Sequence, residues 1–249
     1  MTSPDTDRKG RRSTGFARIP LVKALSAHRP AVSPMVMNLL VAGFLLATAN
    51  ATFLDRVSAY LSGNPGLVPV AAVLAYAAIL FCVSLFTLPG LVRPVLALAL
   101  VLGAVASHFQ DQLGVVIDRD MLQNALNTTG NESRHLMTVG FLTHLTAFGL
   151  VPAALVLWTK AKPMRWWLRL LHYPVTVVLA LGLFFAAMMV DYRTFSSMFR
   201  ERREIASAVI PATPIVAGVR LAKLKLVTAR LVAEPIGLDA KKGARIAAA

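Results

Sequence analysis

Long apolar runs dominate the hydrophobic pattern of this chain, and polar residues gather in the segments between them. Five runs reach about 20 residues, the length that a helix needs to cross a hydrocarbon layer of about 30 Å. Each run must be helical, because a backbone surrounded by lipid has to satisfy its N–H and C=O groups internally. The predicted spans are Met35 to Leu54, Leu67 to Leu88, Val92 to Phe109, Val139 to Trp158 and His172 to Val190.

The predicted fold class is therefore all-α: a polytopic membrane helix bundle of about five transmembrane helices over residues 34–190. The chain has 249 residues, of which 56% are hydrophobic and 15% charged, which is more apolar surface than one soluble core can bury. A transporter or channel is disfavoured, because the spans show no inverted repeat, few charges and no discontinuous helix. The single cysteine, Cys82, lies within a span, which excludes an intramolecular disulfide and a cysteine-based zinc cluster.

Charge predicts the orientation. The net charge of +14 comes from short basic runs beside apolar segments, which favours anionic lipid as a partner and not nucleic acid. Residues 1–33 form a basic leader that we expect to be cytoplasmic, and the basic loop after the fourth span returns to that side. The small residues near Ala49 resemble a signal-peptide cleavage site, but the long leader and the full-length apolar run favour a retained span. The outer loop 110–138 and everything after Val190 are then periplasmic, although four arginines run against the rule there: Arg193, Arg200, Arg202 and Arg203.

The C-terminal part is apolar only intermittently. Residues 191–233 are predicted to form periplasmic or interfacial helices. Within them, Thr213 to Ala233 mixes aliphatic side chains with Arg220, Lys223 and other cations, which is typical of a basic amphipathic helix in the membrane interface. A helix that packs on a partner domain would show the same pattern. Residues 234–249 are polar and predict a linker.

The outer loop carries the most informative polar pattern. If its second half is helical, Asn124, Thr128 and Glu132 lie at i, i+4 and i+8 and share one face. Such a stripe suits a polar lipid head group, because the carboxylate can accept from an ammonium and the amide and hydroxyl can bond phosphate or glycerol oxygens. An ordinary solvated helix face looks the same, and Gly130 weakens the helix on which the pattern depends.

The run VIDRDMLQNALNTTGNES resembles the outer-loop motif of the phosphoethanolamine transferases that modify lipid A, the group that includes the polymyxin-resistance enzymes. The match rests on Asp118, Met121, Gln123, Asn124, Thr128 and Glu132. The five-span layout and the segment DYRTFSSMFRE, residues 191–201, resemble the same family. The similarity extends from about residue 16 to the end of the chain.

The resemblance implies a two-part enzyme of the bacterial inner membrane. A membrane domain positions phosphatidylethanolamine and lipid A, and a periplasmic domain with a zinc-bound threonine transfers phosphoethanolamine. It implies substrate contacts from Asn124, Thr128 and Glu132, with Gln123 and Asp118 as further candidates. We expect no catalytic residue, metal or cofactor in this chain, because it stops at the linker, and zinc belongs to the missing catalytic domain.

The histidines do not change that expectation, because they form no compact ligand set with carboxylates: His28, His108, His135, His144 and His172. The chain is thus expected to be truncated before a periplasmic catalytic domain, which is missing or separate, and to be inactive alone. The alternative is a standalone lipid-binding or scaffold protein of the membrane.

Overall fold

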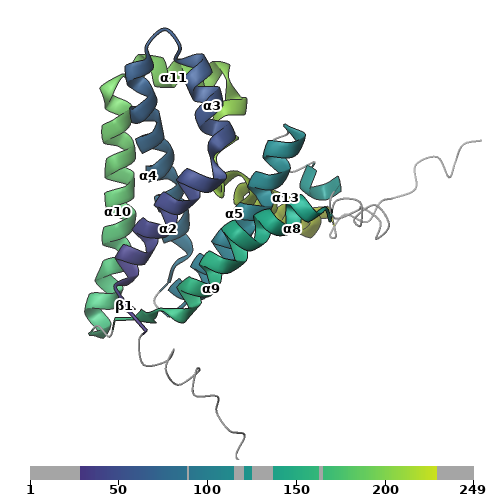
Figure 1. Ribbon diagram of the computed structural model, residues 1–249. Helices are drawn as coiled ribbons and strands as arrows, with labels where there is room; N and C mark the ends of the chain where they lie inside the picture. The colour runs from purple at the N-terminus through teal and green to yellow at the C-terminus, as the bar shows by residue number, and fades with distance from the viewer. Residues whose placement is uncertain (1–28, 89, 115–120, 125–136, 163–164, 229–249) are drawn as a thin grey trace, which may run out of the picture.

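The computed structural model describes residues 29–88, 90–114, 121–124, 137–162 and 165–228, and apart from two strands of two residues each its regular elements are helices (Figure 1). The all-α prediction is confirmed. The helices are α2 (Pro34–Ala49), α3 (Ala51–Tyr60), η1 (Pro65–Leu67), α4 (Val68–Phe86), α5 (Val92–Leu113), α8 (Val139–His144), the π-helical η2 (Leu145–Leu150), α9 (Val151–Trp158), α10 (Trp166–Val190), α11 (Tyr192–Glu201), α12 (Arg203–Ala206) and α13 (Ala212–Thr228).

Four continuous helical stretches of the described chain are long and apolar enough to cross a membrane. They are Pro65–Phe86, Val92–Gln112, Val139–Trp158 and Tyr173–Val190, close to four of the predicted spans. The pair α2 and α3 passes the same test together, and its two halves are bent by 69°. Counting that pair as one span gives five, as the apolar runs predict.

The bend between α2 and α3 corrects the sequence analysis. The first predicted span continues to Leu54 and no discontinuous helix is expected, but α2 ends at Ala49 and α3 starts at Ala51. Asn50 leaves the helical conformation, with φ −123° and ψ 26°. The prediction of one continuous helix was wrong because Asn50, at the break, bonds to Ile210, which is far away in the sequence.

The bundle packs in two neighbouring parts (Figure 1). The helix α4 lies between α10 and α2, and α5 lies along α8, η2 and α9. Leu45, Leu74, Leu80 and Leu100 fill the interior with small residues around them. Many large apolar side chains of α8 to α10 are exposed, such as Val178 at 67%, as expected for helices that face lipid.

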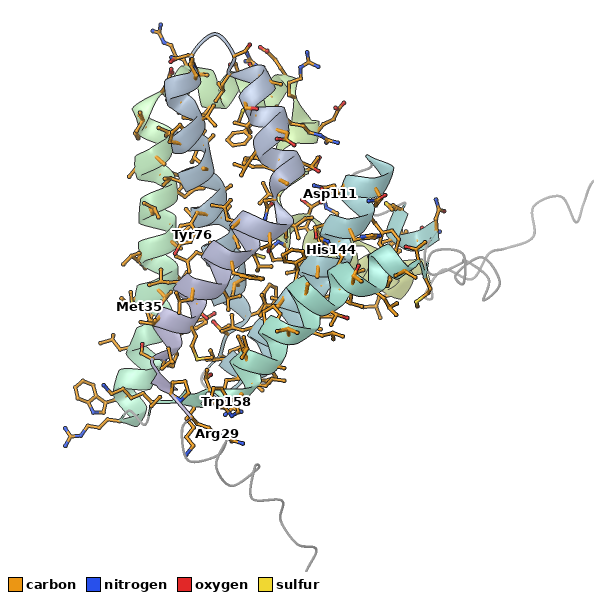
Figure 2. All side chains as sticks on the ribbon, in the orientation of Figure 1. Arg29, Met35, Tyr76, Asp111, His144 and Trp158 are labelled. Carbon is orange, nitrogen blue, oxygen red and sulfur yellow. The ribbon has the colours of Figure 1, made fainter. Side chains whose placement is uncertain are left out.

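The end of the leader meets the loop that follows the fourth span. The two-residue strands β1 (Ala31–Val32) and β2 (Lys160–Ala161) pair in parallel, and the backbone N–H of Lys160 donates to the carbonyl of Pro30 at 3.0 Å. Arg29 and Trp158 accordingly lie at the same lower end of the molecule (Figure 2). These two basic segments therefore share one side of the bundle, which agrees with the charge pattern. The side of the membrane to which that end points stays a prediction.

Two polar side chains, Asn38 and Arg93, hold the helices together at this end. The amide nitrogen of Asn38 in α2 donates to the hydroxyl of Thr87 at 3.0 Å and to that of Ser84 at 3.3 Å, and all three side chains are buried. The guanidinium of Arg93 donates from Nη2 to the carbonyl of Leu157 at 2.6 Å, and it thereby satisfies one of the carbonyls left open by the end of α9.

Candidate functional site

The outer loop starts from a fixed point at the end of α5. Gly114 ends the helix in the left-handed conformation, with φ +64°, and its N–H donates to the carbonyl of Gln110 at 2.9 Å. Arg56 of α3 donates from Nη2 to the Gly114 carbonyl at 3.1 Å, and the hydroxyl of Thr52 donates to the carboxylate of Asp111. The upper half of the first span thus positions the residue at which the loop begins.

Asn50 connects the break in the first span to a segment 160 residues later. Its side chain is 0% exposed. The amide nitrogen donates to the carbonyls of Leu45 and Ile210, each at 2.9 Å, and the amide oxygen accepts from the Ile210 N–H at 2.8 Å. One side chain therefore satisfies both backbone groups of Ile210 and also bonds a carbonyl in the last turns of α2.

Gln110 holds the same segment from α5. The side chain is 1% exposed, and its amide nitrogen donates to the carbonyl of Ala208 at 3.1 Å. Residues 208–210 are consequently fixed between the break in the first span and the last turn of α5. Since α13 starts at Ala212, these two buried amides also set where α13 leaves the bundle.

The structure describes two of the five predicted substrate contacts. Gln123 and Asn124 lie in the helical turn 121–124, and both side chains are exposed. A methyl group at Cβ of Gly218 would lie 3.9 Å from Leu122, so this turn is next to α13. Asp118, Thr128 and Glu132 lie outside the described residues, so the convergence of Asn124 with Thr128 and Glu132 stays a prediction.

A histidine of α5, His108, lies next to a histidine of α8, His144, which Figure 2 shows below Asp111. The ring centroids of His108 and His144 are 5.4 Å apart, and Nε2 of His144 is 3.0 Å from the hydroxyl of Ser107. Phe141 packs edge-on against His108 at 5.3 Å. Among the described residues, no group of three or more His, Cys, Asp and Glu side chains is placed to hold a metal ion.

The segment after the last span forms α11, which lies across the upper end of α4 and α10 (Figure 1). Asp191 caps it: one carboxylate oxygen accepts from the Thr194 N–H at 3.1 Å and the other from the Thr194 hydroxyl at 2.8 Å. These bonds, first the one from the backbone and then the one from the hydroxyl, hold the pKa of Asp191 below its usual value. Phe195 and Met198 are 0% exposed and anchor the helix on the bundle.

Sequence reasoning missed Asn50, Gln110 and Arg56 as the residues that organise this end. A signal was present, because Asn50 interrupts an apolar run and Gln110 follows one. Buried amides in a membrane bundle have to be bonded, so each implies a partner. The identity of that partner, the backbone of residues 208–210, follows only from the fold.

Comparison with known proteins places the sequence in a family. The family described as "Phosphoethanolamine transferase EptA/EptB" matches residues 74–226, which is more than half of the chain. The chain is 35% identical over 201 residues to the phosphatidylethanolamine transferase Mcr-1 of Escherichia coli, covering 80% of this chain and 37% of that protein. It is 31% identical over 210 residues to the phosphoethanolamine transferase EptA of Escherichia coli K12, covering 80% of this chain and 38% of that protein.

A solved structure has the same fold. The integral membrane protein lipooligosaccharide phosphoethanolamine transferase A (EptA) from Neisseria meningitidis aligns with a TM-score of 0.70 at 22% identity, over 84% of this chain and 41% of that one. The chain thus spans little more than a third of the length of the curated relatives that it matches. The match over residues 74–226 and the spanning helices together show that this chain is a multi-pass integral membrane protein of the EptA/EptB phosphoethanolamine transferase family, corresponding to its N-terminal membrane domain.

Proposed function

We propose that this chain holds the head groups of phosphatidylethanolamine, as donor, and of lipid A, as acceptor, at its outer end during phosphoethanolamine transfer. The observation that carries the proposal is the match to a family of phosphoethanolamine transferases across residues 74–226. The relative Mcr-1 is itself named a phosphatidylethanolamine transferase. The exposed amides of Gln123 and Asn124 supply donors and acceptors for phosphate and glycerol oxygens.

The structure supports a positioning role through the way in which the loop is held. Arg56 bonds the carbonyl of Gly114, where the outer loop starts, and Leu122 lies against α13. A loop held at the end of a helix keeps a bound head group in a narrower range of orientations. This restriction accelerates the transfer of phosphoethanolamine from the donor to the acceptor. In this proposal Glu132 accepts from the ethanolamine ammonium, and Asp118 and Thr128 complete the polar surface.

The chemistry of transfer is assigned to another part of the enzyme. The resemblance implies a periplasmic domain with zinc and a threonine nucleophile. We assign the metal to that domain, as the resemblance implies. The outer end then has to face that domain, which requires a cytoplasmic N-terminus and a periplasmic C-terminus. Alkaline phosphatase fused after Ala249 is expected to be active, and an inactive, stably expressed fusion would reverse the orientation.

The decisive experiment measures phosphoethanolamine on lipid A by mass spectrometry. Cells express this chain with a separately supplied catalytic domain of a relative, or either part alone. We expect modification only when both are present, and we expect Asn124→Ala and Glu132→Ala to abolish it. Ser133→Ala is the matched control, because in the helix that the loop pattern predicts, nine residues from Asn124 correspond to the opposite face. Control and wild type should give equal product.

The other outcomes discriminate between the two functions. Product formed by this chain alone would show that the reacting groups lie in it, against the proposal. No product on complementation, together with retained phosphatidylethanolamine in the purified chain, would favour a lipid-binding or scaffold protein. Product that survives in both Asn124→Ala and Glu132→Ala would remove these residues from the site.

A further inference from the structure

An apolar cavity of about 640 Å³ lies between α4, α10 and α13. Its volume falls within the range of about 300–1,000 Å³ that small-molecule sites occupy. Phe185 is 58% exposed and Val219 is 61% exposed, so part of the wall opens to the surroundings of the bundle. The wall is aliphatic and aromatic apart from the thiol of Cys82 and one charged side chain, Arg220 of α13.

The apolar space continues along α4. A smaller cavity of about 270 Å³ adjoins the first and shares Ala78, Phe184 and Ala212 with it. Together the two cavities follow α4 from Ala71 to Phe86, a rise of about 22 Å. One lipid leaflet is about half as deep as the hydrocarbon core of about 30 Å, so the groove is longer than one leaflet is deep. The groove therefore has room for an extended acyl chain.

Cations continue the groove-facing side of α13. Val216, Arg220 and Lys223 lie at i, i+4 and i+7 and so follow one side of the helix. Among the described residues, no carboxylate forms an ion pair with Arg220 or Lys223. A cation beside an apolar groove in a membrane protein is costly unless an anion pairs with it. Arginine in particular favours phosphate, which it can bond through two nitrogens.

We propose that the groove between α4, α10 and α13 binds one acyl chain of an anionic phospholipid of the phosphatidylglycerol type, with Arg220 and Lys223 on its phosphodiester. These two cations complement a net negative lipid. A zwitterionic lipid would bring its own ammonium to the same place, so the donor phosphatidylethanolamine fits this charge pattern less well.

This lipid site is distinct from the head-group surface proposed above and does not depend on it. The turn that carries Gln123 and Asn124 lies next to Gly218, on a different side of α13 from Val216 and Arg220. A chain bound in the groove fixes the helix against which that turn rests. The bound phospholipid is thus a resident component that stabilises α13.

The test uses native mass spectrometry of the full-length chain, delipidated in detergent and titrated with phosphatidylglycerol, phosphatidylethanolamine or diacylglycerol. We expect phosphatidylglycerol to bind at least about tenfold more tightly than the other two. Diacylglycerol lacks the phosphodiester that the two cations would bond, and the ammonium of phosphatidylethanolamine repels them. The double variant Arg220→Gln/Lys223→Gln should lose that preference, and Val216→Trp should block binding by filling the groove. The control variants Arg200→Gln and Val178→Trp change exposed residues outside the groove and should bind as the wild type does.

A second readout on the unmodified protein keeps the proposal falsifiable if a variant does not fold. Cys82 is the single cysteine of the chain and lines the cavity. Phosphatidylglycerol should slow its alkylation by a maleimide at least severalfold, and diacylglycerol should not at the same concentration. Any one of three results would overturn the proposal. These are equal binding of phosphatidylglycerol and phosphatidylethanolamine, unchanged lipid preference in the folded double variant, and alkylation of Cys82 in the wild type that phosphatidylglycerol does not slow.

Discussion

Replacing Asn50 by alanine tests the central claim about how this bundle is held together. The side chain is fully buried and bonds both backbone groups of Ile210 and the carbonyl of Leu45. In Asn50→Ala the N–H and C=O of Ile210 lose their partner inside the protein. Each orphaned group costs about 1–3 kcal/mol, so the variant should be destabilised by roughly 2–6 kcal/mol.

The assay is thermal unfolding of the purified full-length chain in lipid nanodiscs, followed by tryptophan fluorescence. At about 2–4 °C per kcal/mol for a chain of this size, the midpoint should fall by at least about 4 °C. The control is Asn64→Ala, which removes an exposed amide from the loop before α4 and should leave the midpoint unchanged. If the unfolding midpoint of Asn50→Ala lies within about 2 °C of the wild-type midpoint, the bonds of Asn50 contribute much less stability than this estimate requires.

The aspartate variant separates the bonds from the shape of the side chain. Asn50→Asp keeps an acceptor for the Ile210 N–H but turns a carboxylate oxygen toward the carbonyls of Leu45 and Ile210. A buried carboxylate that faces two carbonyl oxygens costs more than a missing side chain. Asn50→Asp should therefore unfold at a lower temperature than Asn50→Ala, and the reverse order would show that the donated bonds carry little stability.

Two further changes test other contacts. A Cβ at Gly149 would lie 3.1 Å from the Cβ of Ala104, so Gly149→Leu should push η2 away from α5 and destabilise the fold by about 1–3 kcal/mol. The control is Gly182→Leu, at a position where an added Cβ meets no atom within 4 Å. Equal unfolding midpoints for the two variants would contradict this packing. The pKa of Asp191 is lower in the folded state than in the unfolded chain, where it is about 3.9. The ionised carboxylate therefore stabilises the fold at a pH above that unfolded value, and this stabilisation is lost as the pH falls through the pKa of the folded state. The unfolding midpoints of wild type and Asp191→Asn should differ at neutral pH and converge in acid, and a gap that persists there would exclude the cap around Thr194 as its source.

The outer-loop motif shows how far a local pattern reaches. The residues from Asp118 to Glu132 resemble the lipid A phosphoethanolamine transferases, and the comparison over residues 74–226 confirms that family. The motif cannot show whether Asn124, Thr128 and Glu132 converge, because that depends on how the loop is held by α13 and by the end of α5. Gln123 and Asn124 are exposed in a helical turn, where a head group can reach them.

By itself the sequence determined the number and approximate limits of the spanning helices, because a backbone in lipid has to be helical and the thickness of the membrane fixes the length. It also determined that the leader and the fourth loop lie at one end. Only the tertiary structure decided where the first span breaks, since the partner of Asn50 is Ile210, 160 residues away. The groove beside Arg220 likewise exists only because α13 returns to α4 and α10, a contact between segments that are far apart in the chain.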